Sequence, residues 1–324
     1  MWFTSSPSPA GEAGAPGPLE RLRASIVADI EEAGGRHDEP RLYDGPPGDP
    51  GLVGGPDSLS WELHGDLASL VLAGTGAVVM EVLEPSVMAG VHDHSSFRTA
   101  PLERARNTLG YVLRTTFGTT EAATRVIERV RKVHGQVSGV RPDGVGYRAL
   151  DPVLIAWVHT CIPWAVMRTY ERYGRPLSRA EQDRYLREQA VVGRMGGAEW
   201  VPETVTELEA FVDEMRPRMA MTDRTAAFVD FLAGEAGPES RAAGIESARG
   251  LDRVDRRLSV LASMSTMPDW ARRLTGTGTS AATRLAALDT SNRLKARLIR
   301  WAYPSLPCKE MALARVAAGE PATP

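Results

Sequence analysis

The chain contains few cysteines and no excess of charge, and each shortage excludes a class of protein. Only two cysteines, Cys161 and Cys308, occur in 324 residues. They lie far apart in the sequence, so they form no CxxC metal motif and no disulfide framework. The formal net charge is −3, with 38 basic and 41 acidic residues mixed along the chain. A nucleic-acid-binding protein normally carries a basic excess, so we expect no nucleic-acid partner.

Long hydrophobic runs are also scarce. The most apolar stretch, residues 67–83, is short for a membrane span and contains Glu81. We expect it to form a buried core helix, and we expect no stable membrane span. The chain does not open with a positively charged leader followed by an apolar segment, so we expect a cytoplasmic location.

The motifs of several common enzyme classes are missing. The chain has no Walker loop, no GxGxxG between a strand and a helix, no GxSxG and no HExxH. Phosphoryl transfer, nicotinamide chemistry and the commonest hydrolase mechanisms therefore lack support.

Helical patterns fill most of the chain. Residues 1–18 are rich in Pro, Gly, Ser and Ala and are expected to form a disordered tail. Residues 19–60 predict a short helix followed by a Pro- and Gly-rich arm. Residues 61–303 predict one all-α domain, and residues 304–324 a C-terminal tail. β-branched residues do not alternate with polar residues over five or more positions, so we expect no strand.

Capping residues mark several helix boundaries. Asp151 followed by Pro152 predicts the start of a helix that runs to about residue 173. Capping boxes of the type S/T-x-x-E begin at Ser178 and Thr204 and predict two further helix starts.

One histidine falls where a helix should be apolar. Residues 119–137 carry apolar residues at three- and four-residue spacing, which predicts an amphipathic helix with one buried face. His134 lies on that face, four positions after Val130. A buried imidazole loses roughly 1–3 kcal/mol for each unpaired nitrogen. Either a hydrogen bond in the core or coordination of an iron ion would satisfy it.

Two further groups stand in apolar surroundings. His159 lies in LIAWVHTCIPW, which predicts a helix that is buried nearly all round, and it needs a partner across a helix interface. Glu81 and Glu84 close the apolar 67–83 segment. We expect Glu81 to be buried, as a candidate general base with a perturbed pKa, and Glu84 to be exposed at the turn.

Two further groups of residues each allow a functional and a structural interpretation. Arg104, Thr108 and Tyr111 share one helical stripe, where the arginine could clamp a carboxylate. The alternative is a solvated arginine and a threonine bonded to its own backbone. His92 and His94, on either side of an aspartate, could converge on a metal ion from a loop. However, the sequence has no third ligand at a spacing typical of a metal-binding motif.

The motifs follow one another in an order that resembles a known family. The segments are EPSVMAGVHDHSSF, RARNT, VRKVHGQVSG, YRALDPVLIAWVHTC and YERYGRPLSRAEQDRYLREQ. They resemble the MpaB and latex-clearing rubber oxygenase family over about residues 61–232. Members of this family are all-helical b-type haem proteins that cleave carbon–carbon double bonds of isoprenoid chains with dioxygen. The resemblance therefore implies one all-α globular domain that encloses haem b.

Carried over residue by residue, the resemblance implies roles for four residues. His134 matches the proximal iron ligand, and His159 is the alternative. Arg104 and Thr108, in RxxxT, match an arginine and a threonine that line the haem site, where the arginine suits a haem propionate.

One position departs from the family pattern. Rubber oxygenases can carry a lysine just before the RxxxT threonine, where it can cap the iron, whereas this chain carries Asn107. Asparagine is a poor iron ligand, so we expect an open or water-bound distal site. The departure weakens rubber cleavage as the specific reaction.

The functional hypothesis is a haem-dependent oxygenase that uses dioxygen on a small, largely apolar substrate such as an isoprenoid or a specialised metabolite. Its candidate catalytic residues are Glu81, Asn107 and Thr108. One alternative is a haem enzyme of specialised metabolism that hydroxylates or rearranges its substrate. Another is a non-catalytic helical protein that binds haem or an apolar ligand. The oligomeric state is not indicated.

Overall fold

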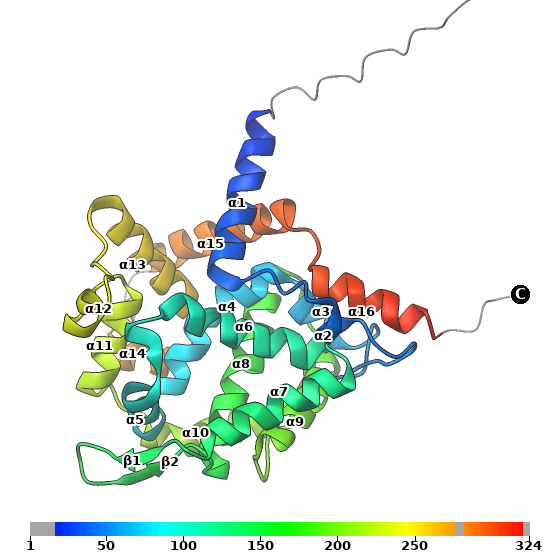
Figure 1. Cartoon of the computed structure of the whole chain (residues 1–324). Helices are drawn as coiled ribbons and strands as arrows, with labels where there is room; N and C mark the ends of the chain where they lie inside the picture. Colours follow the sequence, from blue (N-terminus) through cyan, green and yellow to red (C-terminus); the bar gives the residue numbers. More distant parts are fainter. Residues whose placement is uncertain (1–16, 277–281, 320–324) are drawn as a thin grey trace, which may run out of the picture.

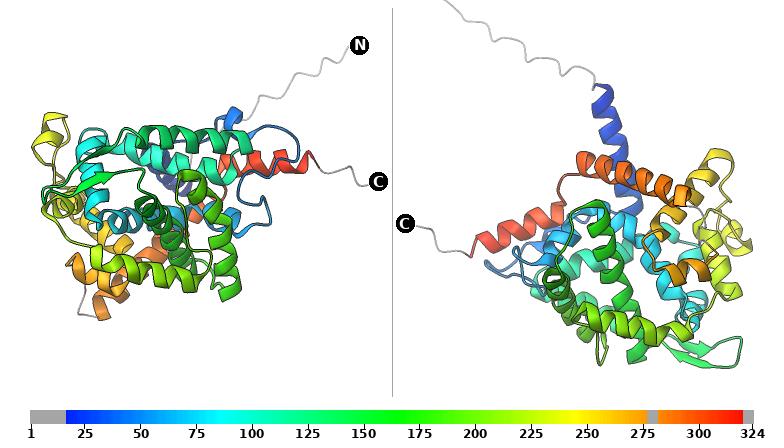
Figure 2. Two further views of the ribbon diagram at one scale, coloured as in Figure 1. Left: turned by 90° about the horizontal axis from the view of Figure 1, so that it is seen from below. Right: turned by 180° about the vertical axis from the view of Figure 1, so that it is seen from behind.

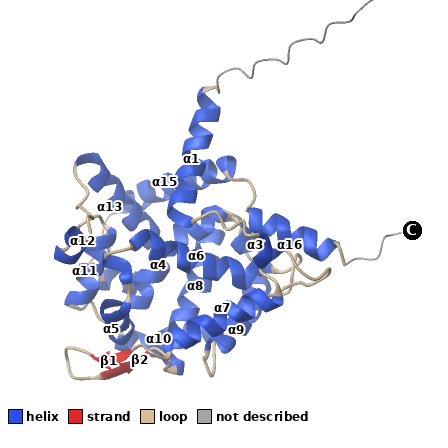
Figure 3. Ribbon diagram, in the orientation of Figure 1, coloured by secondary structure: helices blue, strands red, loops and turns tan. Residues whose placement is uncertain are grey.

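The structure is a computed structural model that describes residues 17–276 and 282–319. The expected tail 1–18 lies outside these residues except for its last two positions. Helices build most of the described chain (Figures 1 and 3). They are α1 Pro18–Gly34, α2 Pro40–Tyr43, α3 Leu59–Gly65, α4 Leu67–Val82, α5 Pro85–His94, α6 Pro101–Phe117, α7 Thr120–His134, α8 Pro152–Tyr173, α9 Arg179–Gly196, α10 Val205–Met215, α11 Asp223–Leu232, α12 Pro238–Ala242, α13 Gly250–Met264, α14 Asp269–Leu274, α15 Ala282–Ala302 and α16 Pro307–Ala317. Short 3₁₀ turns, η1 Ser96–Arg98 and η2 Arg216–Arg218, and a hairpin of β1 Ser138–Val140 and β2 Gly146–Arg148 complete the elements.

Helices α4 and α8 pack against each other in the centre of the molecule, and the other helices surround them (Figures 1 and 2). Both helices are apolar on nearly all sides, as buried helices are. Gly76 lets α13 approach closely, because a Cβ there would lie 2.9 Å from the carbonyl oxygen of Ser263. The prediction of a buried core helix over residues 67–83 is therefore confirmed.

Within the described residues, no single helix has the length and apolar composition needed to cross a membrane. In the part of the chain that the structure describes, only the pair α3 and α4, which is bent by 85°, meets those two requirements when its members are taken together.

The capping predictions are confirmed. The side chain of Asp151 accepts a hydrogen bond from the backbone N–H of Val153, 2.9 Å away, and α8 runs to Tyr173. Both predicted capping boxes form, at Ser178 of α9 and Thr204 of α10. Local sequence therefore sets where these helices begin.

The expectation of a tail over residues 304–324 is wrong for residues 304–319, the part of this range that the structure describes. Pro307 starts α16 rather than ending the fold, because proline suits the first turn of a helix. Cys308, Ala312 and Arg315 of α16 are buried, with at most 2% of their surface exposed. The C-terminal helix thus belongs to the domain.

The expectation of no strand is also wrong, although the sheet is small. β1 and β2 pair antiparallel, with Ser138 opposite Arg148. Each strand has three residues, too few for an alternating pattern. The overlooked signal is the turn: Asp143 precedes Gly144, whose φ is 86°, and Asp-Gly is a strong hairpin signal.

Candidate functional site

Glu81, next to last in α4, lies in an unusual environment. Its side chain is partly exposed, yet desolvation by the surrounding protein raises its pKa to about 8. Burial disfavours the charged form of a carboxyl group, so Glu81 keeps its proton at pH 7. The nearby positive charge of Arg104 opposes the shift. The indole N–H of Trp157 on α8 donates to the backbone carbonyl of Glu81 at 3.3 Å and fixes this end of α4.

His134 is the last residue of α7 and is half-buried. The expectation of a buried face along the whole helix is wrong at this end, where Val133 is 55% exposed, because α7 leaves the core after Ile127. Desolvation, followed by the charge of Arg104, lowers the pKa of His134 below its usual value. The imidazole is therefore neutral at neutral pH. Neither ring nitrogen has a hydrogen-bond partner among residues 17–276 and 282–319.

Arg104 links these two groups, because its charge acts on both Glu81 and His134. Its Nε donates to the Ser95 hydroxyl at 3.0 Å, and its Nη1 donates to the Thr108 hydroxyl at 3.2 Å. Arg104 is exposed and pairs with no carboxylate in the described part of the chain. Its guanidinium is thus held in place and remains available to an anionic group.

The rest of the predicted stripe lies beside this group. Thr108 also donates to the backbone carbonyl of Arg104 at 3.0 Å, as the structural interpretation expected. Tyr111 is partly exposed, yet burial raises its pKa to about 12, so it too is enclosed by protein. Asn107 lies exposed on the same helix.

His159 belongs to a different neighbourhood. Desolvation lowers its pKa to about 4, while a hydrogen bond to the backbone of Gln189 opposes the shift and Arg194 adds to it. Both partners lie on α9. The structure thus brings Glu81, Arg104, Thr108 and His134 together and places His159 against α9.

The possible metal site at His92 and His94 does not form. Both residues lie in the last turn of α5 rather than in a loop, so their side chains diverge. His92 Nδ1 lies 2.9 Å from Asp93 Oδ1, and His94 Nε2 lies 3.2 Å from the carbonyl oxygen of Ser138. Among the described residues, no three His, Cys, Asp or Glu side chains gather into a potential metal site.

Glu84 is buried, and the expectation of an exposed side chain is wrong. It caps α5, accepting hydrogen bonds from the backbone N–H groups of Ser86 at 2.6 Å and Val87 at 2.9 Å. It also pairs with Arg218 at 3.3 Å. These partners stabilise the carboxylate in a position that is 1% exposed.

Sequence reasoning missed a buried histidine that joins three helices. His64 of α3 is 1% exposed. Its Nδ1 lies 2.7 Å from the hydroxyl of Thr116 on α6, and its Nε2 lies 2.7 Å from the hydroxyl of Tyr185 on α9. Thr116 gives its own proton to the Val112 carbonyl at 2.8 Å, so it accepts from His64. The seven-residue α3 is too short to show the periodicity that would have marked this residue.

Two curated proteins resemble part of the chain. They are the uncharacterized protein Rv2237 of Mycobacterium tuberculosis and the uncharacterized protein Mb2261 of Mycobacterium bovis. Each is 30% identical over 130 residues, which cover 39% of this chain and 50% of the relative. The chain thus matches about half the length of these relatives.

No solved structure matches the chain. The family model described as "ER-bound oxygenase mpaB/B'/Rubber oxygenase, catalytic domain" matches residues 61–301. This match extends the resemblance seen in the motifs through the helices that follow, to the end of α15. The chain therefore belongs to the mpaB/rubber oxygenase family and contains its catalytic domain.

Proposed function

We propose that the chain is a haem-dependent oxygenase that uses dioxygen on a small, largely apolar substrate. The observation that carries this proposal is His134, a neutral imidazole whose ring nitrogens have no hydrogen-bond partner among the described residues. Beside it lies Arg104, which pairs with no carboxylate of the described chain. Membership of an oxygenase family supports the reaction class.

The residues present fit a haem group. One histidine can hold an iron ion when a macrocycle supplies the other ligands, as porphyrin does. His134 offers a neutral nitrogen, which is the form that binds metal. Arg104 offers a guanidinium to a propionate, and Thr108 holds that guanidinium in place.

The chain would contribute position and proton transfer to the reaction. A bound haem would supply the activation of dioxygen. Glu81 holds its proton at pH 7 because its pKa is about 8, and its carboxyl oxygen can pass a proton to or from a substrate as the pH rises. Asn107 and Thr108 would line the haem site and would not coordinate the iron.

The perturbed carboxyl favours an enzyme over a carrier. Keeping Glu81 in a desolvated position lowers the free energy of unfolding at high pH. Groups with pKa values shifted in this way are concentrated in active sites. A protein that only stores haem or an apolar ligand needs no such group. Hydroxylation and double-bond cleavage would use the same residues, and products identified by mass spectrometry separate them.

The test is the visible absorption spectrum of the purified chain and of three histidine variants. We expect a Soret band that His134→Ala abolishes while circular dichroism remains helical. His94→Ala, at an exposed position, is the matched control and keeps the band. If His134→Ala retains full haem and His159→Ala loses it, the ligand is His159. If the parent chain neither contains haem nor binds added haemin, the proposal fails.

A further inference from the structure

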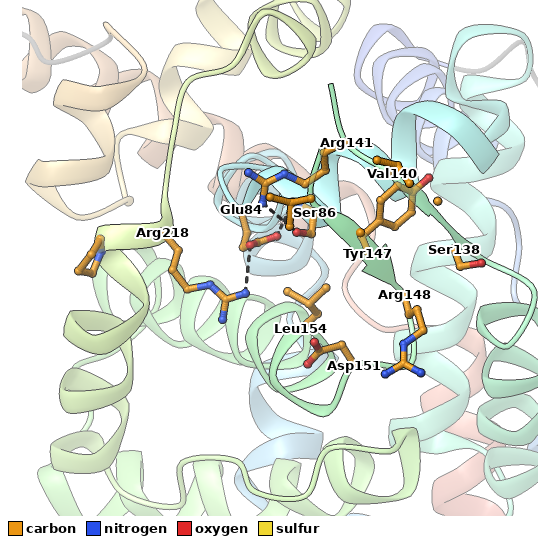
Figure 4. Close-up of a pocket in the computed structure, with 14 residues that line it drawn as sticks. Glu84, Ser86, Ser138, Val140, Arg141, Tyr147, Arg148, Asp151, Leu154 and Arg218 are labelled. Carbon is orange, nitrogen blue, oxygen red and sulfur yellow. Dashed lines mark hydrogen bonds and ion pairs between the residues drawn. The ribbon is translucent and has the colours of Figure 1, made fainter. Parts of the chain in front are cut away.

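A pocket of about 980 Å³ opens beside the hairpin (Figure 4). Its walls are the β1–β2 hairpin, the start of α5, the start of α8 and the turn at Pro217 and Arg218. The side chain of Leu154 lies between Arg218 on one side and Arg148 on the other in the view of Figure 4.

The pocket borders the ends of the helices that carry the candidate site. Glu84, in its wall, follows Glu81 by three residues, and Ser138 follows His134 by four. On α8, Leu154 precedes Trp157 by one helical turn, and Trp157 donates to the backbone carbonyl of Glu81. The same three chain segments therefore form the pocket wall and the neighbouring site.

Most charges in the wall are already satisfied. Glu84 accepts hydrogen bonds from two backbone N–H groups and forms an ion pair with Arg218. Asp151 caps α8, and Arg141 pairs with Asp143. Arg148 is exposed, and its side chain has no hydrogen bond or ion pair with a described residue. Among the described residues that line the pocket, Arg148 therefore carries the one guanidinium without a protein partner.

Apolar side chains accompany this guanidinium. Val140 is 65% exposed and shares a face of the hairpin with Arg148, because the pairs Val140–Gly146 and Ser138–Arg148 lie two residues apart. Leu154 of α8 is buried and lines the pocket as well. Water contact with such a surface is unfavourable, and an apolar ligand would relieve it.

We propose that this pocket binds an amphiphile with a carboxylate head and an apolar body, with the carboxylate on Arg148 and the body along Val140 and Leu154. A guanidinium offers two parallel N–H groups to a carboxylate, which fixes its orientation. The pocket is the entrance by which an acidic, apolar substrate approaches Glu81 and His134. This last role rests on the proposed function, whereas binding in the pocket does not.

The test is fluorescence titration of the full purified chain with cis-parinaric acid and with its methyl ester. Both probes share one apolar chain, and only the acid carries a negative charge. We expect the acid to bind about tenfold more tightly, the effect of one charge-assisted contact. Arg148→Gln should remove this preference. Arg297→Gln is the matched control, because Arg297 is also exposed and unpaired among the described residues but lies on α15, across the molecule from the hairpin (Figure 1).

A second variant fills the pocket instead of discharging it. Gly146 lines the pocket, and a Cβ there would meet only the Gly139 carbonyl oxygen, at 3.9 Å. Gly146→Leu should therefore fold normally and weaken binding of acid and ester alike.

Equal affinity of the parent for acid and ester, or equal behaviour of Arg148→Gln and Arg297→Gln, would overturn the proposal. So would unchanged binding in Gly146→Leu. A chain that lacks haem but shows the expected pattern retains the pocket assignment while the proposed oxygenase fails. A chain that binds haem but shows no preference for the acid gives the reverse result.

Discussion

Gly193 of α9 lies directly against the imidazole ring of His159 on α8. A Cβ at position 193 would lie 2.6 Å from His159 Cδ2 and 2.9 Å from Val201 Cγ1. These distances are too short for ordinary packing, so the absence of a side chain at Gly193 is what lets α9 and α8 approach here. The position of the His159 ring is consequently tied to α9.

Gly193→Ala should therefore move His159 without moving His134. We expect a loss of about 1–3 kcal/mol in the free energy of unfolding from overpacking. The Soret band should keep its position and intensity, because His134 lies on another helix. Denaturant unfolding and absorption spectra measure the two effects. A shifted or missing Soret band in a folded variant would assign the iron to His159.

Asn107 should leave the sixth coordination position open to small ligands. It replaces the lysine that can cap the iron in rubber oxygenases, and it lies exposed on α6. We expect imidazole or cyanide to shift the Soret band of the ferric protein in one rapid phase, whereas Asn107→Lys should bind them slowly. Stopped-flow absorption follows both proteins. A resting six-coordinate low-spin spectrum with nitrogen ligation would contradict the expectation.

Arg104 should retain haem more than it stabilises the fold. In Arg104→Ala we expect transfer of haem to an apo-globin scavenger to be several-fold to about tenfold faster, since the guanidinium is exposed and its ion pairs are worth about 1 kcal/mol. Arg104→Lys should restore retention only in part, because the two-pronged contact is lost. Removing the positive charge should also raise the pKa of His134 and of Glu81. Unchanged transfer rates in both variants would make Arg104 an ordinary surface residue.

Glu81 should give the reaction a pH dependence with a midpoint near 8. Its pKa is about 8, so the carboxylate that can accept a substrate proton appears only as the pH rises through that value. We expect kcat to increase through pH 8 and Glu81→Gln to lower it about 10²–10⁴-fold at every pH, without the rise. A rise that persists in Glu81→Gln belongs to another group.

The same shift affects stability in the opposite direction. The folded chain holds a proton on Glu81 that the unfolded chain releases near its ordinary pKa. The stabilisation from this proton is complete at low pH and disappears as the pH rises through about 8. The free energy of unfolding of the parent chain should therefore decline as the pH rises, and Glu81→Gln should flatten this decline. Denaturant unfolding in buffers from about pH 5 to about pH 9, a range that spans the pKa shift, measures both proteins.

Arg315 should be among the charged residues whose removal costs the most stability. It is 2% exposed and donates to four backbone carbonyl oxygens, those of Tyr43, Asp49, Phe117 and Gly118. Arg315→Ala leaves these acceptors unpaired, and we expect a loss of about 3 kcal/mol in the free energy of unfolding. Arg125→Ala, which breaks only an exposed pair with Glu121, should cost less than about 0.5 kcal/mol. Equal costs would contradict the role of Arg315.

Local signals predicted the helices well because they act over a few residues. Asp151, Ser178 and Thr204 each satisfy backbone N–H groups at a helix start, and the structure confirms all three. Pro307 was ambiguous because proline both ends one helix and starts the next. Only the contacts of α16 with the body of the protein decide between these outcomes.

The candidate site was harder to predict because its properties depend on the tertiary structure. Spacing placed Arg104 and Thr108 on one stripe, but it could not show that Arg104 stands near both Glu81 and His134. Glu84 looked exposed because its capping role depends on the chain turning at Pro85. The roles of these residues in haem binding remain predictions from the resemblance.

The buried link at His64 makes the fold sensitive to acid. Burial and the neighbouring His159 hold the pKa of His64 near 3, far below its ordinary value of 6.5. As the pH falls below 6.5, the unfolded chain therefore takes up a proton that the folded chain refuses, and the equilibrium moves toward unfolding until the pH reaches about 3. The junction of α3, α6 and α9 at His64 thus contributes to the lower pH limit of the whole domain.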